Sequence, residues 1–556
     1  MSHSGSRSAP QSVLKTHEVS NQPSPREGHD LWANDAILRL HTAGAPEAEL
    51  AAFGAALGTA ELRAAARLAN KHTPELVSFD RAGRRLDEVR FHPSYHELME
   101  AGLSRGIASA AWDGAKAGHV QHAAMVYMMS QVEPGVTCPM VMTYAAVPAL
   151  AADAQLRGVW KPKLTARGYD SSIAPVASKR AATLGMAMTE KQGGSDVRAN
   201  TTRAERDGEG YRLRGHKWFC SAPMSDGFLT LAQAQGGLTC FLVPRWLEGA
   251  RNGVQIMRLK DKLGNRAHAS SEIEYHDAYA MRLGEEGQGV KTIIEMVHHT
   301  RLSTAVAPAG LMRGALDEAA WWCKHRSVFQ RRLIDQPLMQ RVLADMVLDQ
   351  EGTTALAMHM ARAFDAGDKA FGRVGVALAK YLGNKLCPGF VYEAMECLGG
   401  NGYVEEAPLA RHYREAPVNA IWEGSGNVQA LDVLRAMNKS PAVVDTWFEE
   451  LAGAQGRNAT LDNAINDLKK ELADPEQIEF RARDLVDRMA LTMQSALLVK
   501  AGNDSVSEAF IAARLGGGHT RNYGSLPRDV KQAADKRIAG YDDPVDFYVE
   551  KLVEGI

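Results

Sequence analysis

The chain has 556 residues and a formal net charge of −2, with 45% hydrophobic and 23% charged residues. Because domains usually hold about 100–200 residues, this length predicts three or four packed units and excludes a single small core. The composition is that of a soluble globular protein, no apolar run approaches the ~18 residues of a membrane span, and the near-neutral charge gives no global reason to expect a polyanionic partner.

The predicted elements run in the order helix, sheet, helix, helix. Residues 1–34 begin with the Ser/Pro-rich MSHSGSRSAPQS and are predicted to be disordered or extended. Residues 35–183 are Ala- and Leu-rich with helical spacing, interrupted by the turn-like FDRAGRR. Residues 184–290 carry short β-rich segments such as FLTLAQA and predict a small antiparallel domain. Residues 291–440 predict a helical bundle, and residues 441–556 a helical extension with a Gly-rich break.

The cysteines and histidines favour a reducing, cytoplasmic setting without a bound metal. The six cysteines are widely spaced, form no CxxC pair and follow no secretory signal. The histidines form no HExxH motif, and the adjacent pair His298-His299 is read as one packed and one solvated side chain.

Three local stretches could carry chemistry, and each has a plainer interpretation. TEKQGGSD, residues 189–196, offers a hydroxyl and free N–H groups that suit a phosphate or a flavin edge, but taken alone it is better explained as a simple glycine turn. KWFCS, residues 217–221, could lay an indole beside a flat cofactor, although strand aromatics are usually core. In IWEGSGN, residues 421–427, Glu423 is a surface residue unless the Gly-Ser-Gly that follows it admits a ligand.

Together and in this order, these stretches resemble the motifs of the flavin-dependent acyl-CoA dehydrogenases. HRSVFQRRLIDQP and MECLGGNGYVEE resemble two further motifs of that family, and the resemblance covers roughly residues 35–438. It implies a multidomain α+β fold: an N-terminal α-helical domain, a central antiparallel β domain and a C-terminal four-helix bundle. The tail after Lys439, Trp422 in place of the usual Tyr, and the wording RLKDKLGNRAHAS are similar to the AidB branch, which is linked to DNA alkylation damage and has an extra C-terminal helical domain.

The resemblance implies that Glu423 is the catalytic base. It would remove the α-proton of an acyl thioester while the β-hydrogen leaves as hydride to the flavin, and burial beside Trp422 would raise its pKa toward a useful range. Some branches carry the base just before the arginine at the start of the next helix, but here Thr300 precedes Arg301 and cannot serve. The resemblance assigns substrate contacts to Arg301, Trp422 and Glu423. A structural salt bridge is the competing role for Glu423.

The resemblance also implies FAD, shared between subunits of a homotetramer built as a dimer of dimers. The FAD contacts within one chain would be Met188, Thr189, Gly194, Ser195, Trp218, Phe219, Cys220, Ser221, Trp422, Ser425 and Asn427. The contacts to FAD bound mainly by a neighbouring subunit would be Arg326, Phe329, Gln336, Glu396, Gly399 and Gly400. Cys220 stands where many relatives have Thr, and Glu396 where many have Gln, which puts a hydrogen bond to the flavin and a contact with phosphate in doubt.

The resemblance to the AidB branch raises the question of double-stranded DNA. Residues 441–556 hold 20 acidic and 14 basic residues, which opposes strong attraction to phosphate if the charges are spread evenly. The candidate DNA contacts are Arg435, at the junction with the tail, and Arg514, Arg521, Arg528, Lys531, Lys536 and Arg537, around the Gly-rich break. An ordinary solvated face explains this cluster equally well. No recognition-helix signature is present, so any contact would be to the DNA backbone and not sequence-specific.

Two functions are therefore expected from different classes. The first is an FAD-dependent acyl-CoA dehydrogenase with weak activity on short or branched acyl-CoA. The second is a flavoprotein that binds DNA and protects it from alkylating agents, with residual dehydrogenase chemistry. Oxidation of another small molecule by the same pocket stays a third alternative.

Overall fold

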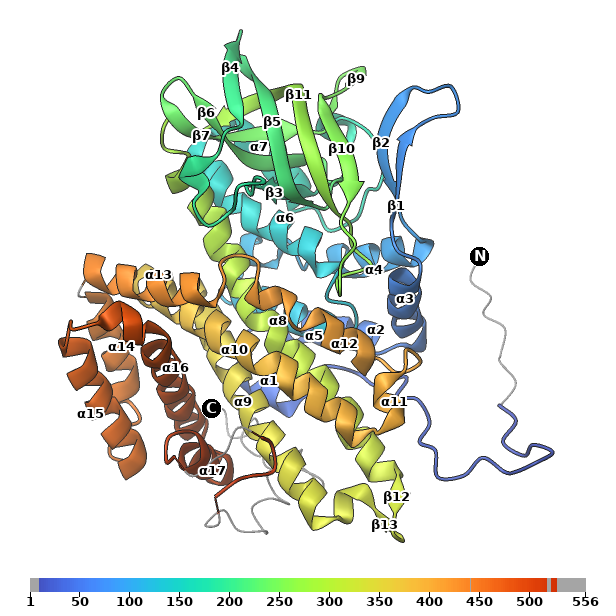
Figure 1. Ribbon diagram of the computed structural model, residues 1–556, viewed down its shortest axis with the longest axis vertical. Coiled ribbons are helices and arrows are strands. Elements are labelled where there is room, and N and C mark those ends of the chain that lie inside the picture. The colour runs from blue at the N-terminus through green and yellow to red at the C-terminus, as the bar shows by residue number, and fades with distance from the viewer. Residues whose placement is uncertain (1–9, 441, 518–521, 528–556) are drawn as a thin grey trace.

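The computed structural model describes residues 10–440, 442–517 and 522–527 of the chain (Figure 1). A β domain occupies one end of the long axis, and helices fill the rest (Figure 1). Along the chain, a helical region is followed by the β domain, by long helices and by a further helical extension. This arrangement confirms the predicted fold class.

The N-terminal region is helical except for one hairpin. Its elements are α1 (Ala36–His41), α2 (Glu47–Leu57), α3 (Ala60–Lys71), β1 (Glu75–Phe79), β2 (Arg85–Arg90), α4 (Pro93–Leu103), α5 (Gly118–Ser130), α6 (Thr137–Ala149) and α7 (Ala154–Leu164). Helices α5 and α6 are apolar and buried on nearly all faces, as expected of helices inside a large core. The turn-like FDRAGRR proves to be the turn of the β1–β2 hairpin, closed by Asp80 accepting N–H bonds from Ala82 and Arg84, but the two strands that flank it were not predicted.

Residues 10–34 are mostly extended, and their second half is fixed along α8 (Gly289–His325). Arg26 is buried there and pairs with Asp317 at 3.1 Å and Glu318 at 3.3 Å. The indole N–H of Trp321 donates to the carbonyl of Ser24 at 2.9 Å. A polar sequence can therefore be ordered by charged partners almost 300 positions away.

The β domain is a twisted sheet that closes on itself around its own apolar core. Its strands are β3 (Leu184–Ala187), β4 (Arg203–Asp207), β5 (Gly210–Ser221), β6 (Gly227–Ala234), β7 (Gly237–Pro244), β8 (Trp246–Leu247), β9 (Ala250–Arg251), β10 (Val254–Leu259) and β11 (Ser270–Leu283). The main order is β10-β11-β5-β4-β6-β3, and β7 pairs with both β11 and β6. Most pairs are antiparallel, but β3 and β4 each run parallel to β6, and β8 and β9 form a separate two-stranded sheet. Leu213, Phe228, Phe241 and Ile273 are among the residues that fill the interior.

A β-bulge interrupts the pairing of β5 with β11. Cys220 pairs with Ser271 and Lys217 pairs with Ile273, so Trp218 and Phe219 together oppose the single residue Glu272. Such an extra residue bends a strand and redirects its side chains. Lys217 and Cys220 are consequently both buried, whereas Phe219 is exposed and Trp218 is half-buried.

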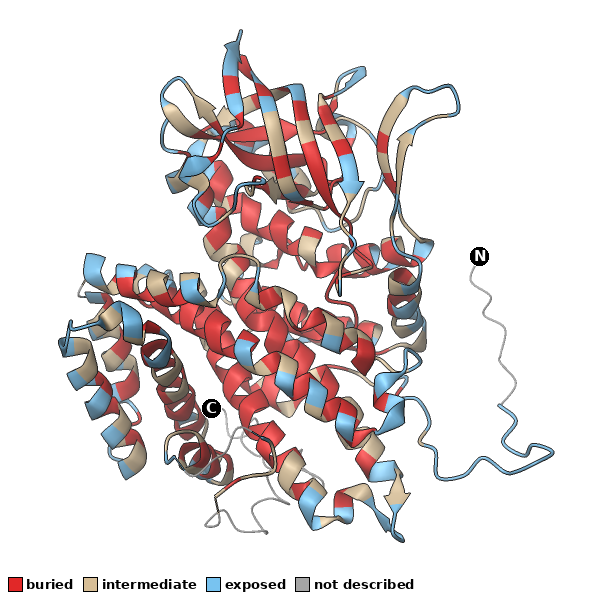
Figure 2. Cartoon of the chain, in the orientation of Figure 1, coloured by how far each residue is buried: buried red, intermediate tan, exposed pale blue. Residues whose placement is uncertain are grey.

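Long helices form the centre of the molecule (Figures 1 and 2). After α8 come β12 (Ser327–Val328), β13 (Arg331–Arg332), α9 (Pro337–Asp365), α10 (Lys369–Cys397), α11 (Gly400–Tyr403), α12 (Leu409–Glu415) and α13 (Gly426–Lys439). Figure 2 shows that α8, α9 and α10 are buried along most of their length. Helix α8 approaches α5 so closely that a Cβ at Gly310 would lie 2.2 Å from the carbonyl oxygen of Tyr127.

The C-terminal extension packs against the bundle. Its helices are α14 (Ala442–Ala452), α15 (Ala459–Ala473), α16 (Ile478–Ala501) and α17 (Asp504–Arg514). Arg514 at the end of α17 pairs with Asp345 at 2.7 Å and with Asp349 at 2.8 Å, both on α9. The hydroxyl of Tyr523 donates to Asp349 at 2.9 Å. These buried charged contacts hold the extension on the bundle.

Candidate active site

Glu423 lies in a short loop just before α13. Its φ angle of +57° is in the left-handed region, which is costly for a residue with a side chain, and Gly424 follows with φ +101°. A Cβ at Gly424 would lie 2.6 Å from the side-chain amide nitrogen of Gln429, and the positive φ would strain any other residue at this position. The Gly-Ser-Gly run therefore begins with a glycine that the backbone requires.

Side chains from three helices fix the carbonyl groups of this loop. Arg301 on α8 donates to the carbonyl of Glu423 at 3.1 Å, and Gln429 on α13 donates to the same oxygen at 2.9 Å. Lys380 on α10 donates to the carbonyl of Gly424 at 2.8 Å and to that of Asn419 at 3.0 Å. The unfavourable backbone of Glu423 is thus held by groups far apart in the sequence.

The carboxyl group of Glu423 is buried and incompletely hydrogen-bonded. Its Oε2 atom has no partner among the described residues. Burial raises the pKa of Glu423, and the Thr300 hydroxyl, Arg301 and Lys380 oppose this rise without cancelling it. A buried carboxylate with a free oxygen and a raised pKa has the properties of a general base.

Trp422 and Cys138 flank this carboxyl group. The indole N–H of Trp422 donates to the side-chain oxygen of Asn419 at 2.9 Å. Cys138 near the start of α6 is close enough to Glu423 for their charges to interact, and the nearby Ser221 at the end of β5 acts to lower the pKa of its thiol. Burial raises the pKa of the Cys138 thiol to about 12, so it is neutral. Cys138 therefore connects the Glu423 loop with the strand that carries Trp218.

The glycine turn after β3 is fixed to β5 by a buried ion pair. Lys217 and Glu190 are both fully buried and lie 2.9 Å apart. The backbone N–H of Trp218 also donates to the carbonyl of Thr189 at 2.8 Å. Burial disfavours the charge on Glu190, but Lys217 and the donors from Thr201 and Thr202 outweigh it and hold the pKa of Glu190 well below its usual range. Residues 189–195 and Trp218 consequently form one rigid unit.

The bulge in β5 separates the side chains that were expected to line a flavin. Phe219 and Trp218 face outward, and the Lys260 ammonium lies 3.3 Å from the centre of the Trp218 ring. The thiol of Cys220 is instead buried inside the β domain, near Arg245 and Tyr275. Ser221 reaches Cys138, and Met188 is half-buried beside the turn. Contact between the Cys220 side chain and a ligand on the Trp218 side is therefore not favoured by this geometry.

The second group of expected cofactor residues lies at the opposite end of the bundle, around β12, β13 and α11 (Figure 1). Arg326 donates to the carbonyl of Asn21, and Gln336 donates to the carbonyl of Val328 at 3.1 Å. Phe329 is 91% exposed at the hairpin tip. Glu396, Gly399 and Gly400 are exposed at the α10–α11 junction, where Asn401 contacts Gln22 at 3.4 Å. Residues 21 and 22 thus contact both the β12–β13 region and the α10–α11 junction, and this second group of residues lies away from Trp218.

Three sequence profiles match consecutive parts of the chain. The AidB N-terminal domain profile, described as that of the adaptive response protein AidB, matches residues 21–171. The acyl-CoA dehydrogenase middle-domain profile matches residues 185–278, and the C-terminal-domain profile matches residues 287–438. The chain is 44% identical to the acyl-CoA dehydrogenase homologue AidB of Escherichia coli (strain K12) over 515 residues, which cover 90% of this chain and 95% of that protein.

This chain belongs to the AidB branch of the acyl-CoA dehydrogenase family.

Two further relatives agree with this assignment and confirm the resemblance read from the motifs. Acyl-CoA dehydrogenase family member 11 of Caenorhabditis elegans is 32% identical over 89% of this chain and 82% of its own length. The crystal structure of C. elegans ACDH-11 in complex with C11-CoA superposes with a TM-score of 0.81 at 27% identity, covering 96% of this chain and 94% of that one. Acyl-CoA dehydrogenases are FAD-dependent flavoproteins.

The residues of the glycine turn fit part of an FAD molecule. A Cβ at Gly194 would lie 2.4 Å from the Thr189 hydroxyl. The absence of a side chain at Gly194 therefore lets the Thr189 hydroxyl lie close to the backbone of the turn. The N–H groups of Gly194 and Ser195 have no hydrogen-bond partner among the described residues, and Ser195 is exposed. Unpaired N–H and hydroxyl groups are the donors that a flavin or a phosphate accepts from. Ser425 and Asn427, at the start of α13, are likewise exposed.

The structure corrects one of the expected DNA contacts. The Arg514 side chain is only 8% exposed and is occupied by Asp345 and Asp349, so it stabilises the packing of α17 and is not presented to phosphate. Arg435 is exposed and contacts Asp432 at 3.1 Å, the same aspartate that pairs with Arg301. The remaining candidates, Arg521, Arg528, Lys531, Lys536 and Arg537, lie outside the described residues.

Cys138 and Lys380 are the residues at this site that sequence reasoning missed. Neither stands in a recognised motif, and the only signal was the helical spacing that buries both. Within the described ranges, no helix combines the length and apolar composition needed to cross a membrane, and no cluster of three metal-ligating side chains is present.

Proposed function

We propose that the chain is an FAD-dependent acyl-CoA dehydrogenase in which Glu423 removes the α-proton of a short or branched acyl-CoA thioester. The observation that carries this proposal is the buried Glu423 carboxyl group with its unpartnered Oε2 and raised pKa. FAD, when bound, would accept the β-hydrogen as hydride. The chain itself would supply the base, the positioning of the thioester and the exclusion of water.

The backbone around Glu423 would assist the reaction by positioning the Glu423 N–H group. Arg301 and Gln429 both donate hydrogen bonds to the carbonyl oxygen of Glu423. The resemblance assigns a hydrogen bond from the N–H of Glu423 to the thioester oxygen, which would stabilise the enolate as it develops. Because these two hydrogen bonds fix the left-handed backbone of Glu423, its N–H group and its carboxylate keep a constant orientation relative to each other.

Trp422 supports the preference for short or branched acyl groups. Its indole is larger than the tyrosine that is usual at this position and is held by Asn419 at 2.9 Å. A fixed bulky ring next to the base leaves less room for a long acyl chain. The substrate range of this chain is inferred from that restriction.

The cofactor group at the far end of the bundle supports a shared FAD site and an oligomer. Arg326, Phe329, Gln336, Glu396, Gly399 and Gly400 lie away from Trp218 within one chain, so both groups can touch one FAD only if two copies associate. Phe329, Leu338 and Tyr403 are 91%, 83% and 81% exposed in the isolated chain. Such an apolar surface is typical of a protein interface. This surface supports association of copies of the chain, and the homotetramer itself stays what the resemblance implies.

A DNA-protecting function is not favoured by the described residues. Arg514 is internal, and Arg435 shares Asp432 with Arg301. The geometry of the described residues supports the dehydrogenase proposal best, and DNA binding by the five candidates outside the described residues stays a prediction.

The proposal is tested by anaerobic titration of the holoenzyme with butyryl-, isovaleryl- and lauroyl-CoA, following loss of the flavin absorbance. We expect bleaching with the short and branched thioesters, a decrease of about 10²–10⁴-fold in its rate for Glu423→Gln, and no change for the control Glu449→Gln. Glu449 is an exposed residue on α14. Bleaching at the same rate in Glu423→Gln would refute the role of Glu423.

A further inference from the structure

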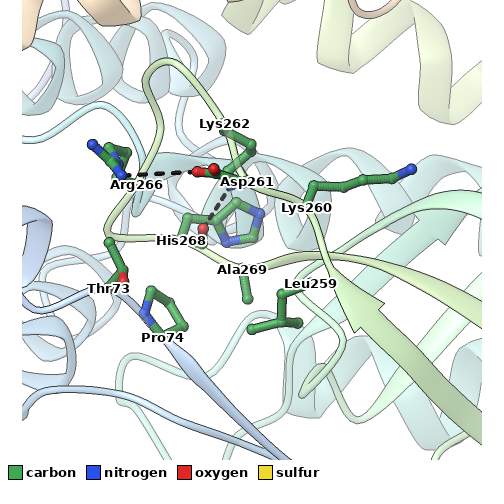
Figure 3. Close-up of a pocket in the computed structure, with 9 residues that line it drawn as sticks. All are labelled: Thr73, Pro74, Leu259, Lys260, Asp261, Lys262, Arg266, His268 and Ala269. Carbon is green, nitrogen blue, oxygen red and sulfur yellow. Dashed lines mark hydrogen bonds and ion pairs between the residues drawn. The ribbon is translucent and has the colours of Figure 1, made fainter.

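A cavity of about 220 Å³ lies beside the proposed flavin site and has no part in the function proposed above (Figure 3). It is formed between the link from α3 to β1 and the loop that joins β10 to β11. Its lining residues are Thr73, Pro74, Leu259, Lys260, Asp261, Lys262, Arg266, His268 and Ala269. Basic side chains outnumber acidic ones in this lining, which favours a negatively charged ligand.

His268 lies at the centre of the lining residues (Figure 3), and its imidazole ring has no hydrogen-bond partner among the described residues. It is 1% exposed, and neither ring nitrogen is paired with any described residue. Burial, reinforced by the charge of Lys262, lowers the pKa of His268 well below its ordinary value, so the ring is neutral and carries one N–H donor. Buried polar groups in native proteins are almost always paired, and this unpaired imidazole has an N–H donor available for a ligand that enters the cavity.

Lys262 places a positive charge next to this imidazole. Its ammonium donates to the carbonyl of His268 at 2.6 Å and to the hydroxyl of Ser270 at 3.1 Å. No carboxylate lies within ion-pair distance of it among the described residues. Burial lowers the pKa of Lys262 to about 8, so most of the side chain remains charged at neutral pH. The more distant charges of Glu415 and Glu133 favour the charged form of Lys262 without pairing with it, and a bound anion in the cavity would favour it further.

Of the other two basic side chains, Arg266 is available at the mouth of the cavity, whereas Lys260 is engaged outside it. Arg266 reaches Asp261 only at 3.8 Å, and the Asp261 side chain is 99% exposed, so this ion pair is weak. Lys260 pairs with Glu272 at 2.6 Å and also covers the Trp218 ring. An anion in the cavity would therefore lie one side chain away from the strand proposed to contact the flavin.

We propose that this cavity is a binding site for a phosphoryl group, held by Lys262 and His268 inside and by Arg266 at the mouth. A phosphate presents several acceptor oxygens in different directions, which matches donors arriving from separate sides, whereas a carboxylate presents only two oxygens. The volume is below the ~300–1,000 Å³ of sites that enclose drug-sized ligands. The site therefore takes either free phosphate or the phosphate group of a larger molecule that extends into solvent.

Binding of inorganic phosphate to the holoenzyme, measured by isothermal titration calorimetry at constant ionic strength, tests the proposal without any turnover. We expect one saturable site per chain. His268→Ala and the exposed-side variant Arg266→Ala should each weaken it by about tenfold or more, because each removes a hydrogen bond to a charged group. The control Arg214→Ala removes an exposed arginine of β5 that pairs with Asp277 away from the cavity, and it should bind as the wild type does.

A competition experiment identifies the source of the phosphoryl group. Displacement of phosphate by CoA but not by dephospho-CoA, which lacks the 3′-phosphate, would assign the site to a phosphate-bearing ligand. Displacement by neither would assign it to free phosphate. The proposal is overturned if no saturable phosphate binding is found up to roughly 10 mM, or if His268→Ala and Arg266→Ala bind phosphate as tightly as the wild type. Failure here leaves the role of Glu423 untouched, because the two experiments measure different events.

Discussion

The side chain of Arg301 donates a hydrogen bond to the backbone carbonyl of Glu423 at 3.1 Å, across 122 positions of sequence. This bond, together with those from Gln429 and Lys380, holds Glu423 in a left-handed conformation that residues with a Cβ seldom adopt. Backbone strain of this kind persists only where the surroundings enforce it, and it is frequent at active sites. These bonds fix the backbone from which the buried Glu423 side chain projects, and so fix its direction.

The strain at Glu423 predicts an inverted order of stability between two inactive variants. Glu423→Gly removes the Cβ that disfavours φ +57°, whereas Glu423→Ala keeps it. We expect Glu423→Gly to be more stable than Glu423→Ala by up to about 1 kcal/mol, since the relief of the left-handed penalty exceeds the entropic cost of glycine. Urea denaturation of both variants measures the difference. A more stable Glu423→Ala would show that the loop relaxes and that no strain is stored there.

Removing the charge of Lys380 should shift the pH profile of kcat/KM in a defined direction. Its positive charge lowers the pKa of Glu423, so Lys380→Met should raise that pKa. Protonated Glu423 cannot accept a proton, so activity is lost as the pH falls through its pKa, and the acid limb of kcat/KM should shift to higher pH in Lys380→Met. Burial lowers the pKa of Lys380 itself to about 7, so the wild-type charge is already partial at neutral pH.

Lys380→Arg is the matched control because it keeps the positive charge. Its acid limb should stay close to that of the wild type even if kcat decreases through altered contacts with Gly424. An unchanged acid limb in Lys380→Met would mean that Lys380 acts on the loop only as a hydrogen-bond donor.

The buried pair of Lys217 and Glu190 predicts a large loss of stability when one partner is removed. Lys217→Met leaves a buried carboxylate without its cation, which typically costs about 3–5 kcal/mol. Because this pair anchors the glycine turn beside Trp218, the FAD content of the purified protein should decrease in parallel. Denaturant unfolding and the flavin-to-protein absorbance ratio give the two measurements.

The double variant Lys217→Met with Glu190→Leu distinguishes the cost of an unpaired buried charge from the cost of altered packing. Replacing both charges by apolar groups should recover part of the stability that the single variant loses. If the single variant is as stable as the wild type, water reaches the pair and the turn is not anchored by it.

The fold and the chemistry of the site were predictable to different extents. Recurring motifs located the β domain, the long helices and Glu423, because each depends on residues that are close in the sequence. The burial of the Cys220 thiol was not predictable, since it depends on a bulge that places Trp218 and Phe219 opposite one residue of β11. Arg514 belonged to a basic cluster in the sequence, but its partners Asp345 and Asp349 stand about 170 positions earlier.

The exposure of Phe329 predicts that association of two copies of the chain and binding of FAD depend on the same residue. The Phe329→Asp variant should lower both the molar mass in solution and the FAD content, because the exposed hairpin tip is proposed to meet FAD of a second copy. Phe480 on α16 is similarly exposed, at 88%, and Phe480→Asp should change neither quantity. Light scattering coupled to size-exclusion chromatography, with the flavin absorbance, gives both values. Wild-type mass and FAD content in Phe329→Asp would place the interface elsewhere.

The central claim is that Glu423 takes a proton from the carbon next to a thioester carbonyl. The most direct measurement is the exchange of that α-proton for deuterium in heavy water under anaerobic conditions, followed by NMR of isovaleryl-CoA, because exchange reports proton removal without requiring net oxidation. The account predicts exchange by the wild-type holoenzyme and by Glu449→Gln, and a loss of about 10²–10⁴-fold in Glu423→Gln. Exchange at the wild-type rate in Glu423→Gln would contradict it.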